Sequence, residues 1–127
     1  MAVHKVHMVL QGKGGVAKTF ASVMLAQQIG SRGNLPLCAD TDPVNATFTG
    51  FAALNVQRIE IMNGDEIDPR AFDALIELIA SHEGDVVVDN GASSFIPLAS
   101  YMLQNDVAGL LQSMGRQLVI HTLITGG

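Results

Sequence analysis

The chain has 127 residues, 48% of them apolar, and this size and hydrophobicity suit one compact domain with a buried core rather than two domains. Its formal net charge is −5 with only 7 lysine and arginine residues, which argues against a direct nucleic-acid site in this stretch. No apolar run approaches the roughly 20 residues that span a bilayer, and no signal-like block opens the chain, so we expect a cytoplasmic protein without a transmembrane segment.

The first third of the chain reads as a strand, a helix and a second strand. Residues 6–10 predict a strand that runs directly into a glycine-rich turn, and a helix is expected from there to about Ser31. The apolar face of this helix is expected to hold Phe20, Val23 and Met24. Gly33 is placed to cap the helix end.

A second strand is predicted over residues 35–40, and it stops at an acidic loop. It contains Cys38, the only cysteine, which has no partner for an internal disulfide and is expected to be a small buried apolar residue. Further along, Asp68 and Pro69 supply an N-cap and a first-turn proline for a helix over 69–81. The apolar residues at helical spacing in that helix are Phe72, Leu75, Ile76 and Ile79.

The last third of the chain continues the same alternation. Residues 85–89 are short and rich in valine, as a central strand of a parallel sheet is, and the loop 90–95 follows. Residues 97–114 predict one helix, or two that are broken at Asn105 and Asp106, and residues 118–124 predict a further strand. The whole pattern predicts an α/β fold, a parallel sheet with helices on both faces.

The segment 11–19 joins the first strand to the first helix and has the composition of a phosphate-binding loop. Its glycines let backbone N–H groups approach phosphate oxygens, and the helix that begins near Lys18 points its positive dipole end at the same place. Lys18 would neutralise the β and γ phosphates and the Thr19 hydroxyl would bind Mg²⁺. The alternative is a glycine-rich turn that binds nothing. The candidate nucleotide-binding residues are Gly12, Lys13, Gly14, Gly15, Val16, Ala17, Lys18 and Thr19.

Lys13 departs from the ordinary P-loop, and the run 13–19 (KGGVAKT) resembles the deviant Walker A motif of the partition ATPase and MinD-like (ParA/MinD-like) family. The resemblance implies a P-loop NTPase fold of the SIMIBI, MinD-like class. It also implies that Lys13 acts catalytically on the nucleotide of a partner subunit in a nucleotide-dependent homodimer. The alternative is a solvent-exposed lysine. Ala17 stands where that family usually has glycine, and a methyl group is tolerated there if the position is already helical.

Carboxylates end the second strand and the valine-rich strand. Asp40 and Asp42 lie in a sequence similar to the family's Asp-x-Asp-Pro motif, which implies that Asp42 orients the attacking water and that Asp40 supports the magnesium or the loop. Asp89 stands at the Walker B position, where a carboxylate holds magnesium, so the candidate metal residues are Thr19, Asp40 and Asp89. The alternative for the first motif is an ordinary turn that closes a strand. The loop after Asp89 either senses the γ phosphate through the N–H groups of Gly91 and Ala92 or only joins two elements.

Four short sequence segments, spread over nearly the whole chain, resemble those of a more specific family, the TraL-type conjugal transfer proteins of broad-host-range plasmids. They are the runs 8–15 (MVLQGKGG), 40–47 (DTDPVNAT), 63–67 (NGDEI) and 88–95 (VDNGASSF). This resemblance implies a bacterial, plasmid-encoded protein that works with other plasmid transfer proteins. Proteins of this kind continue well past the last predicted strand, so residues 1–127 are expected to be the N-terminal part of a single P-loop nucleotide-binding domain.

These observations lead to one preferred function and one rival. We expect an ATP-binding and ATP-hydrolysing dimeric switch of plasmid conjugal transfer or partition, with ATP and Mg²⁺ as its ligands. The rival is a non-hydrolysing module that binds nucleotide or a partner without chemistry. Phosphate release, measured against an Asp42→Ala control, separates the two.

Overall fold

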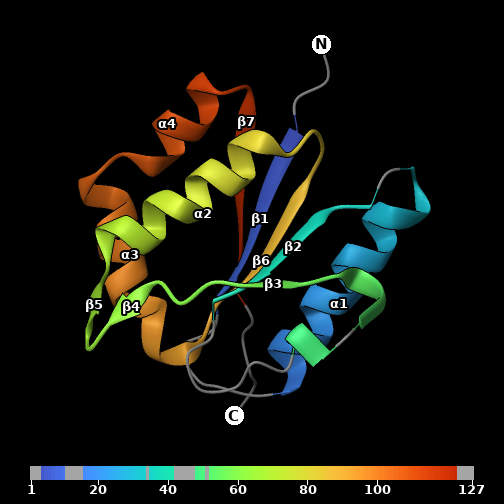
Figure 1. The fold of residues 1–127 in the computed structure, drawn as a ribbon, viewed down its shortest axis with the longest axis horizontal. Coiled ribbons are helices and arrows are strands. Elements are labelled where there is room, and N and C mark those ends of the chain that lie inside the picture. Colours follow the sequence, from blue (N-terminus) through green and yellow to red (C-terminus); the bar gives the residue numbers. More distant parts are fainter. Residues whose placement is uncertain (1–3, 11–15, 34, 42–47, 51, 123–127) are drawn as a thin grey trace.

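The computed structural model describes residues 4–10, 16–33, 35–41, 48–50 and 52–122. Its centre is a five-stranded, fully parallel sheet with the order β3-β2-β6-β1-β7 (Figure 1). The strands are β1 (His4–Leu10), β2 (Leu37–Asp40), β3 (Gln57–Arg58), β6 (Val86–Asp89) and β7 (Arg116–Thr122). A small antiparallel pair, β4 (Met62–Asn63) and β5 (Glu66–Ile67), lies outside this sheet.

Helices cover both faces of the sheet, which confirms the predicted α/β architecture (Figure 1). Among the described residues, helix α1 (Val16–Ser31) covers one face, and the other face is covered by α2 (Pro69–Ser81), α3 (Phe95–Gln104) and α4 (Val107–Ser113). The short 3₁₀ turns are η1 (Phe48–Gly50), η2 (Ala52–Leu54) and η3 (Ala92–Ser94). None of the helices in the described segments combines the length and apolarity that crossing a bilayer requires.

The chain path creates a topological switch point between β1 and β6. From β1 the chain crosses to β2 through α1, which packs on the intervening strand β6. From β6 it crosses to β7 on the opposite side of β1, through α3 and α4 on the opposite face. The two connections therefore leave neighbouring strands in opposite directions. In open α/β sheets, ligands bind in the crevice outside the carboxyl ends of such a strand pair.

Strand alternation divides the core into two clusters. On the face with three helices, Val6 and Met8 of β1 and Val88 of β6 pack against buried residues of α2, α3 and α4. On the α1 face, Val87 and Cys38 pack against a smaller cluster that includes Val23, Ala26 and Phe48. Cys38 is 1% exposed, as predicted, and burial raises the pKa of its thiol to about 11.

Helix α2 begins and ends where the sequence predicts, because its signals are local. The Asp68 side chain accepts a hydrogen bond of 3.0 Å from the backbone N–H of Arg70, and Pro69 opens the helix. The predicted break between α3 and α4 is also confirmed. It lies at Asp106, whose left-handed φ of 46° turns the chain while its carboxylate accepts from the N–H of Gly109.

The strand ends differ from the predicted ones by a few residues. β1 and β7 begin two residues earlier than predicted, at His4 and Arg116, while β2 begins later, at Leu37. Residues 123 and 124 of the last predicted strand lie outside the described residues. These ends are set by pairing with neighbours, since β1 and β7 pair along their full length from His4 and Arg116 onward.

The predicted apolar face of α1 is corrected by the structure. Val23 is buried, but Phe20 is 62% exposed and Met24 is 52% exposed. The helix instead turns Lys18, Ser22 and Ala26 toward the sheet, because Lys18 and Ser22 bind a carboxylate at the end of β6. Polar contacts thus set the rotation of a helix whose apolar residues are spread around its circumference. Its end is as predicted: the N–H of Gly33 donates to Gly30 O, with a φ of 154° at Gly33.

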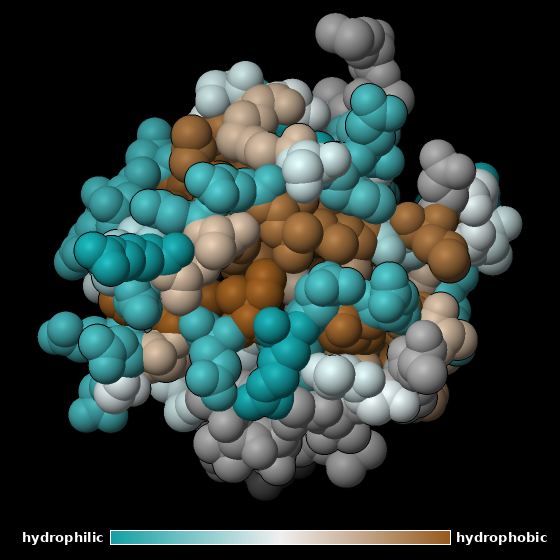
Figure 2. Space-filling view, in the orientation of Figure 1, coloured by the Kyte–Doolittle hydropathy of each residue, from teal (hydrophilic) through white to brown (hydrophobic). Residues whose placement is uncertain are grey.

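Figure 2 shows a band of hydrophobic surface across the middle of one face, bordered by hydrophilic side chains. It lies over the region where α2 passes beside β2 and β3 in Figure 1. Partly buried Leu37, Ile59 and Ile76 pack against the larger core cluster. The larger core cluster is therefore continuous with partly exposed apolar side chains on this face of the molecule.

Candidate functional site

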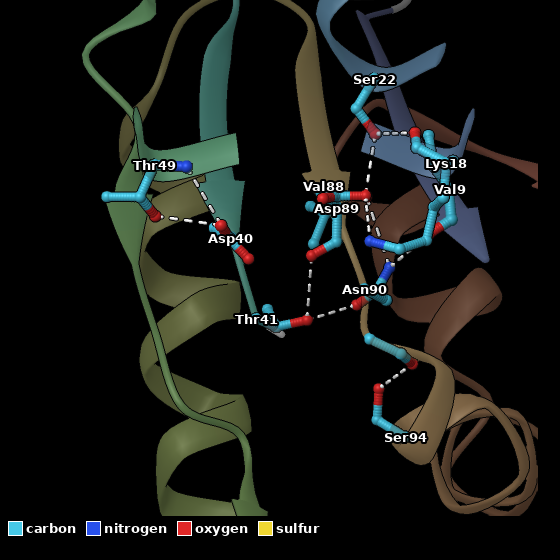
Figure 3. A network of polar contacts seen from close by, with 11 residues as sticks. Val9, Lys18, Ser22, Asp40, Thr41, Thr49, Val88, Asp89, Asn90 and Ser94 are labelled. Carbon is cyan, nitrogen blue, oxygen red and sulfur yellow. Dashed lines mark hydrogen bonds and ion pairs between the residues drawn. The ribbon is translucent and has the colours of Figure 1, made fainter. Parts of the chain in front are cut away.

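The carboxyl ends of three adjacent strands meet beside the first turns of α1 (Figure 3). Strand register places Asp89, the last residue of β6, next to Val9 of β1 and Asp40 of β2. Asp40 and Asp89 are both fully buried, at 0% exposure. The two carboxylates that the sequence predicts at strand ends therefore lie side by side, at the edge where the topology places a ligand crevice.

Lys18 and Asp89 form a buried ion pair. Lys18 Nζ donates to Asp89 Oδ1 at 2.7 Å, and the two side chains are 2% and 0% exposed. Ser22 follows Lys18 by one helical turn, so it lies on the same face of α1, and its hydroxyl lies 2.9 Å from the same Asp89 oxygen. The hydroxyl is also 3.2 Å from the carbonyl oxygen of Lys18. Sequence reasoning missed Ser22, although its spacing of four residues from Lys18 is a usable signal.

The electrostatics of Asp89 reflect its burial and its neighbours. The pKa of Asp89 lies above its ordinary value, chiefly because of burial and with a further contribution from Asp40. The hydrogen bond and charge of Lys18 and the hydrogen bond of Ser22 oppose this rise. A buried carboxylate of this kind is stabilised mainly by a cation in direct contact. The charged form of Asp89 therefore depends on the nearby positive charge of Lys18.

Asp40 anchors the segment that returns to β3. Its Oδ2 accepts hydrogen bonds from the backbone N–H of Thr49 at 3.1 Å and from the Thr49 hydroxyl at 3.0 Å. These bonds tie η1 to the end of β2, nine residues earlier in the chain. The sequence carries no local signal for Thr49, because the contact arises only when the chain folds back on itself. In the described residues, the Asp40 carboxylate thus holds η1 against the end of β2.

Thr41 and Asn90 link the ends of β2 and β6 (Figure 3). The Thr41 hydroxyl lies 2.7 Å from Asn90 Oδ1 and 3.3 Å from the carbonyl oxygen of Asp89. The backbone N–H of Asn90 donates to Val9 O at 3.1 Å, which adds the end of β1. Both side chains are buried, at 1% and 0% exposure. Thr41 directly follows Asp40, and Asn90 directly follows Asp89. The carboxylates at the strand ends therefore predict the location of the site, but they do not predict that Thr41 and Asn90 take part in it.

The turn after Asn90 is closed by Ser94. The Ser94 hydroxyl donates to Gly91 O at 2.8 Å, and the Ser94 backbone N–H donates to the same oxygen at 3.2 Å. This bonding shapes η3 before α3 begins at Phe95. The described geometry places Gly91, one of the predicted phosphate-sensing positions, in a buried turn at the site edge.

Several predicted residues fall where the structure gives no description. Gly12, Lys13, Gly14, Gly15 and Asp42 lie outside the described residues. Val16, Ala17 and Thr19 belong to α1, so the helix begins two residues before Lys18 and position 17 is helical. Lys18, Asp40 and Asp89 are thus the predicted site residues that the structure brings together.

A second polar cluster lies away from this site, around Asp85. His4 Nδ1 and His7 Nε2 lie 3.9 and 4.0 Å from its carboxylate oxygens. His7 Nδ1 also lies 2.9 Å from His121 Nε2, and burial, more than the charge of His121, lowers the pKa of His7. Across the described part of the chain, no group of three or more His, Cys, Asp or Glu residues could hold a metal ion.

Comparison with known proteins gives a specific similarity. Two curated proteins of Escherichia coli, each named Protein TraL, are 61% identical to this chain over 123 residues. The match covers 97% of this chain and 51% of each relative, so the chain spans about half the length of the curated relatives it matches. The resemblance to TraL-type proteins predicted from the sequence is confirmed. No family model matches the chain, and no solved structure matches it.

Proposed function

We propose that this chain binds a nucleoside triphosphate, ATP, together with Mg²⁺, at a deviant P-loop in the N-terminal part of a nucleotide-binding domain. One observation carries the proposal. The lysine of the glycine-rich motif is buried against the carboxylate that ends the valine-rich strand, with 2.7 Å between Lys18 Nζ and Asp89 Oδ1. This pairing lies at the switch point of a doubly wound sheet, where such folds bind ligands.

Each part of the site has a physical role in binding a triphosphate. Lys18 supplies a positive charge from the first turn of α1, a helix of 16 residues whose N-terminus favours anions. The loop 12–15 supplies backbone N–H groups, and its glycines leave room for phosphate oxygens. Charge and hydrogen bonds together would hold the β and γ phosphates at the carboxyl edge of the sheet.

The residues present suit a magnesium ion. Mg²⁺ prefers oxygen ligands and is usually held by one or two protein groups together with substrate phosphates and water. Asp89 offers a buried carboxylate and Asp40 a second one beside it, and the Thr19 hydroxyl completes the set expected from the motif. When bound, the ion would neutralise charge on the transferring phosphoryl group. Because the phosphates complete the coordination, a protein-only cluster of three ligands is not required.

Hydrolysis is the second part of the proposal. Asp42 would orient the attacking water, and Lys13 would reach the nucleotide of a second copy in a nucleotide-dependent homodimer. Phosphate release by the wild type, compared with Asp42→Ala and Lys13→Ala, tests both roles. Binding without phosphate release in every form would favour the rival function, a non-hydrolysing module.

The similarity to Protein TraL supports a biological setting for this chemistry. We place the chain in a bacterial plasmid conjugal transfer system, where a dimeric ATP switch would act with other plasmid transfer proteins in the cytoplasm. The alternative setting is plasmid partition, which the resemblance of residues 13–19 to the partition ATPases suggests.

Isothermal titration with Mg²⁺ and ATP tests the central binding claim. Lys18→Ala is expected to abolish measurable binding, because one cation and the loop amides act on the same highly charged group. Lys5→Ala is the matched control: Lys5 is an exposed lysine near the opposite end of β1, and its loss is expected to leave affinity unchanged. A thermal melt confirms that each variant is folded. Wild-type affinity in folded Lys18→Ala would refute the P-loop assignment.

A further inference from the structure

We infer that the outer face of α3, together with the β4–β5 hairpin beside it, binds a positively charged amphipathic segment of a partner protein. Helix α3 and the hairpin are neighbours on the side of the sheet that also carries α2 and α4 (Figure 1). The inference concerns this surface and not the ligand site at the strand ends. It therefore goes beyond the proposed function and does not depend on nucleotide binding.

Helix α3 presents apolar side chains on two of its sides. Its buried side places Leu98 and Met102 in the larger core cluster. Its outer side carries Ile96 and Leu103, which are 75% and 83% exposed, the two highest values among the large apolar residues of the described segments. Seven residues separate them, so they lie on one face, two turns apart. A surface helix normally has charged residues on its outer face, yet none occurs in the sequence of α3, FIPLASYMLQ.

A groove runs beside this outer face. It consists of two hollows that meet at Ile96 and Pro97, and one hollow extends to Ile67 of the hairpin while the other extends to Met62. We call it the α3 groove. Because its walls come from two different elements and include apolar side chains, it can take up the apolar side chains of a segment that lies along α3. Recognition of an amphipathic helix in a groove uses such anchors at helical spacing.

The α3 groove is held in place by the core beneath it. The ring of Tyr101, which also lines the groove, packs edge-on against Phe72 of α2 with 4.9 Å between the ring centroids. Ile67 of the hairpin is nearly buried and belongs to the same core cluster as Leu98 of α3. Both walls are therefore fixed before a partner arrives, which lowers the entropic cost of binding.

The charge around the α3 groove determines which partner fits. Three acidic residues line it, Glu60, Asp65 and Glu66, and no lysine or arginine is found among the described residues that line it. Glu60 lies 3.4 Å from Arg58, but neither Asp65 nor Glu66 has an ion pair within the described segments. Such a surface repels nucleic acid and anionic membranes. A second copy in a two-fold contact would bring the same carboxylates together. A segment with lysine or arginine beside apolar residues complements both the charge and the apolar wall.

The main test measures binding of a defined probe to the chain without nucleotide. The probe is a fluorescent synthetic helical peptide with leucine on one face and lysine on the other, and its affinity is measured by anisotropy. Ile96→Ser/Leu103→Ser removes two apolar anchors and is expected to weaken binding by at least about tenfold. Phe20→Ser/Leu35→Ser is the matched control, because both residues are 62% exposed and lie outside the groove. The control is expected to keep wild-type affinity.

A second pair of variants tests the charge. Asp65→Asn/Glu66→Gln is expected to weaken binding at low salt by about threefold or more, as loss of two exposed ion pairs would. This loss is expected to shrink at high salt, because salt screens exposed charges. Asp73→Asn/Glu77→Gln removes two exposed carboxylates of α2 outside the groove and is expected to have a much smaller effect. A peptide with glutamate in place of lysine is expected not to bind.

Several results would overturn the inference once thermal melts show that the variants are folded. Equal weakening in the groove variants and their controls would mean general attraction to a protein with a net charge of −5. Equal binding of the glutamate peptide would exclude a role for charge. Binding of duplex DNA or anionic vesicles that is lost in Ile96→Ser/Leu103→Ser would assign the surface to a different class of partner. A chain that binds no ATP but shows the expected pattern would confirm this inference and refute only the proposed function.

Discussion

The two faces of the sheet differ in what their side chains do. The face covered by α2, α3 and α4 is a continuous apolar core, in which residues such as Phe72, Leu75 and Leu98 pack against the strands. The face covered by α1 has a smaller apolar cluster and ends in a buried polar group made of Lys18, Ser22 and Asp89. One face thus carries most of the hydrophobic stabilisation, while the other holds groups whose burial is costly. Substitutions on the two faces are therefore expected to have separable effects.

The largest expected effect is on the polar face, at the buried ion pair. Lys18→Met leaves Asp89 buried without that cation and is expected to lower the free energy of unfolding by about 3–5 kcal/mol. The double variant Lys18→Met/Asp89→Leu replaces both charges by apolar groups and is expected to recover much of the loss. Urea unfolding of the two single variants and the double variant measures the coupling. Additive losses would show that the pair contributes no interaction energy.

Leu75→Ala tests the apolar face. Leu75 is fully buried in α2, so removing its side chain is expected to cost about 2–5 kcal/mol of unfolding free energy. Leu103→Ala is the matched control: Leu103 is 83% exposed, and the change there is expected to stay within about 0.5 kcal/mol. The affinity of folded Leu75→Ala for Mg²⁺ and ATP is expected to equal that of the wild type. Equal unfolding free energies in the two variants, or a large loss of affinity in Leu75→Ala, would erase the distinction between the faces.

A smaller effect is expected where the strand ends are joined. Thr41→Val keeps the shape of the side chain but removes the donor to buried Asn90 Oδ1, at a cost of about 1–3 kcal/mol. Thr122→Val makes the same change at an exposed position in β7 and is expected to have little effect. Chemical denaturation of both variants gives the comparison. A cost in Thr41→Val no greater than in Thr122→Val would mean that the link does not stabilise the site.

The smallest expected effect concerns pH. Burial and His121 lower the pKa of His7 below its ordinary value of 6.5, with Lys5 adding to this and Asp85 opposing it. The unfolded chain therefore binds a proton at a higher pH than the folded chain, so this contribution to stability is complete above about pH 6.5 and is lost as the pH falls toward the lowered pKa. Unfolding measured from pH 8 to pH 5 is expected to depend less on pH in His7→Gln. The same dependence of unfolding free energy on pH in the wild type and in His7→Gln would contradict this prediction.

Local signals explain what the sequence predicts correctly. The start of α2 follows from Asp68 and Pro69, and the break before α4 follows from Asp106, because capping and turn formation depend on nearby residues. The strand-end carboxylates were found because parallel strands end at one edge of a sheet. These features need no knowledge of which residues meet across the fold.

The features that the sequence does not predict depend on contacts between residues that are distant in the chain. The two-residue strand β3 has no period to detect and is held by pairing with β2, where the N–H of Ile59 donates to Asp40 O. Thr49 and Asn90 likewise matter through residues distant in the chain. The sequence predicts the wrong buried face for α1, because Phe20 is apolar but exposed, while the polar contacts of Lys18 turn that side of the helix toward the sheet.

Backbone amide shifts give the most direct test of the central claim, that the ligand site lies at the carboxyl edge of the sheet. A ¹H–¹⁵N spectrum of the chain is recorded before and after addition of Mg²⁺ and ATP. The largest shifts are expected in the first turns of α1 and at Thr41 and Asn90, while Lys5 and Asp85 at the opposite edge are expected to stay nearly unchanged. No shift at saturating ligand, or shifts centred on Lys5 and Asp85, would contradict it.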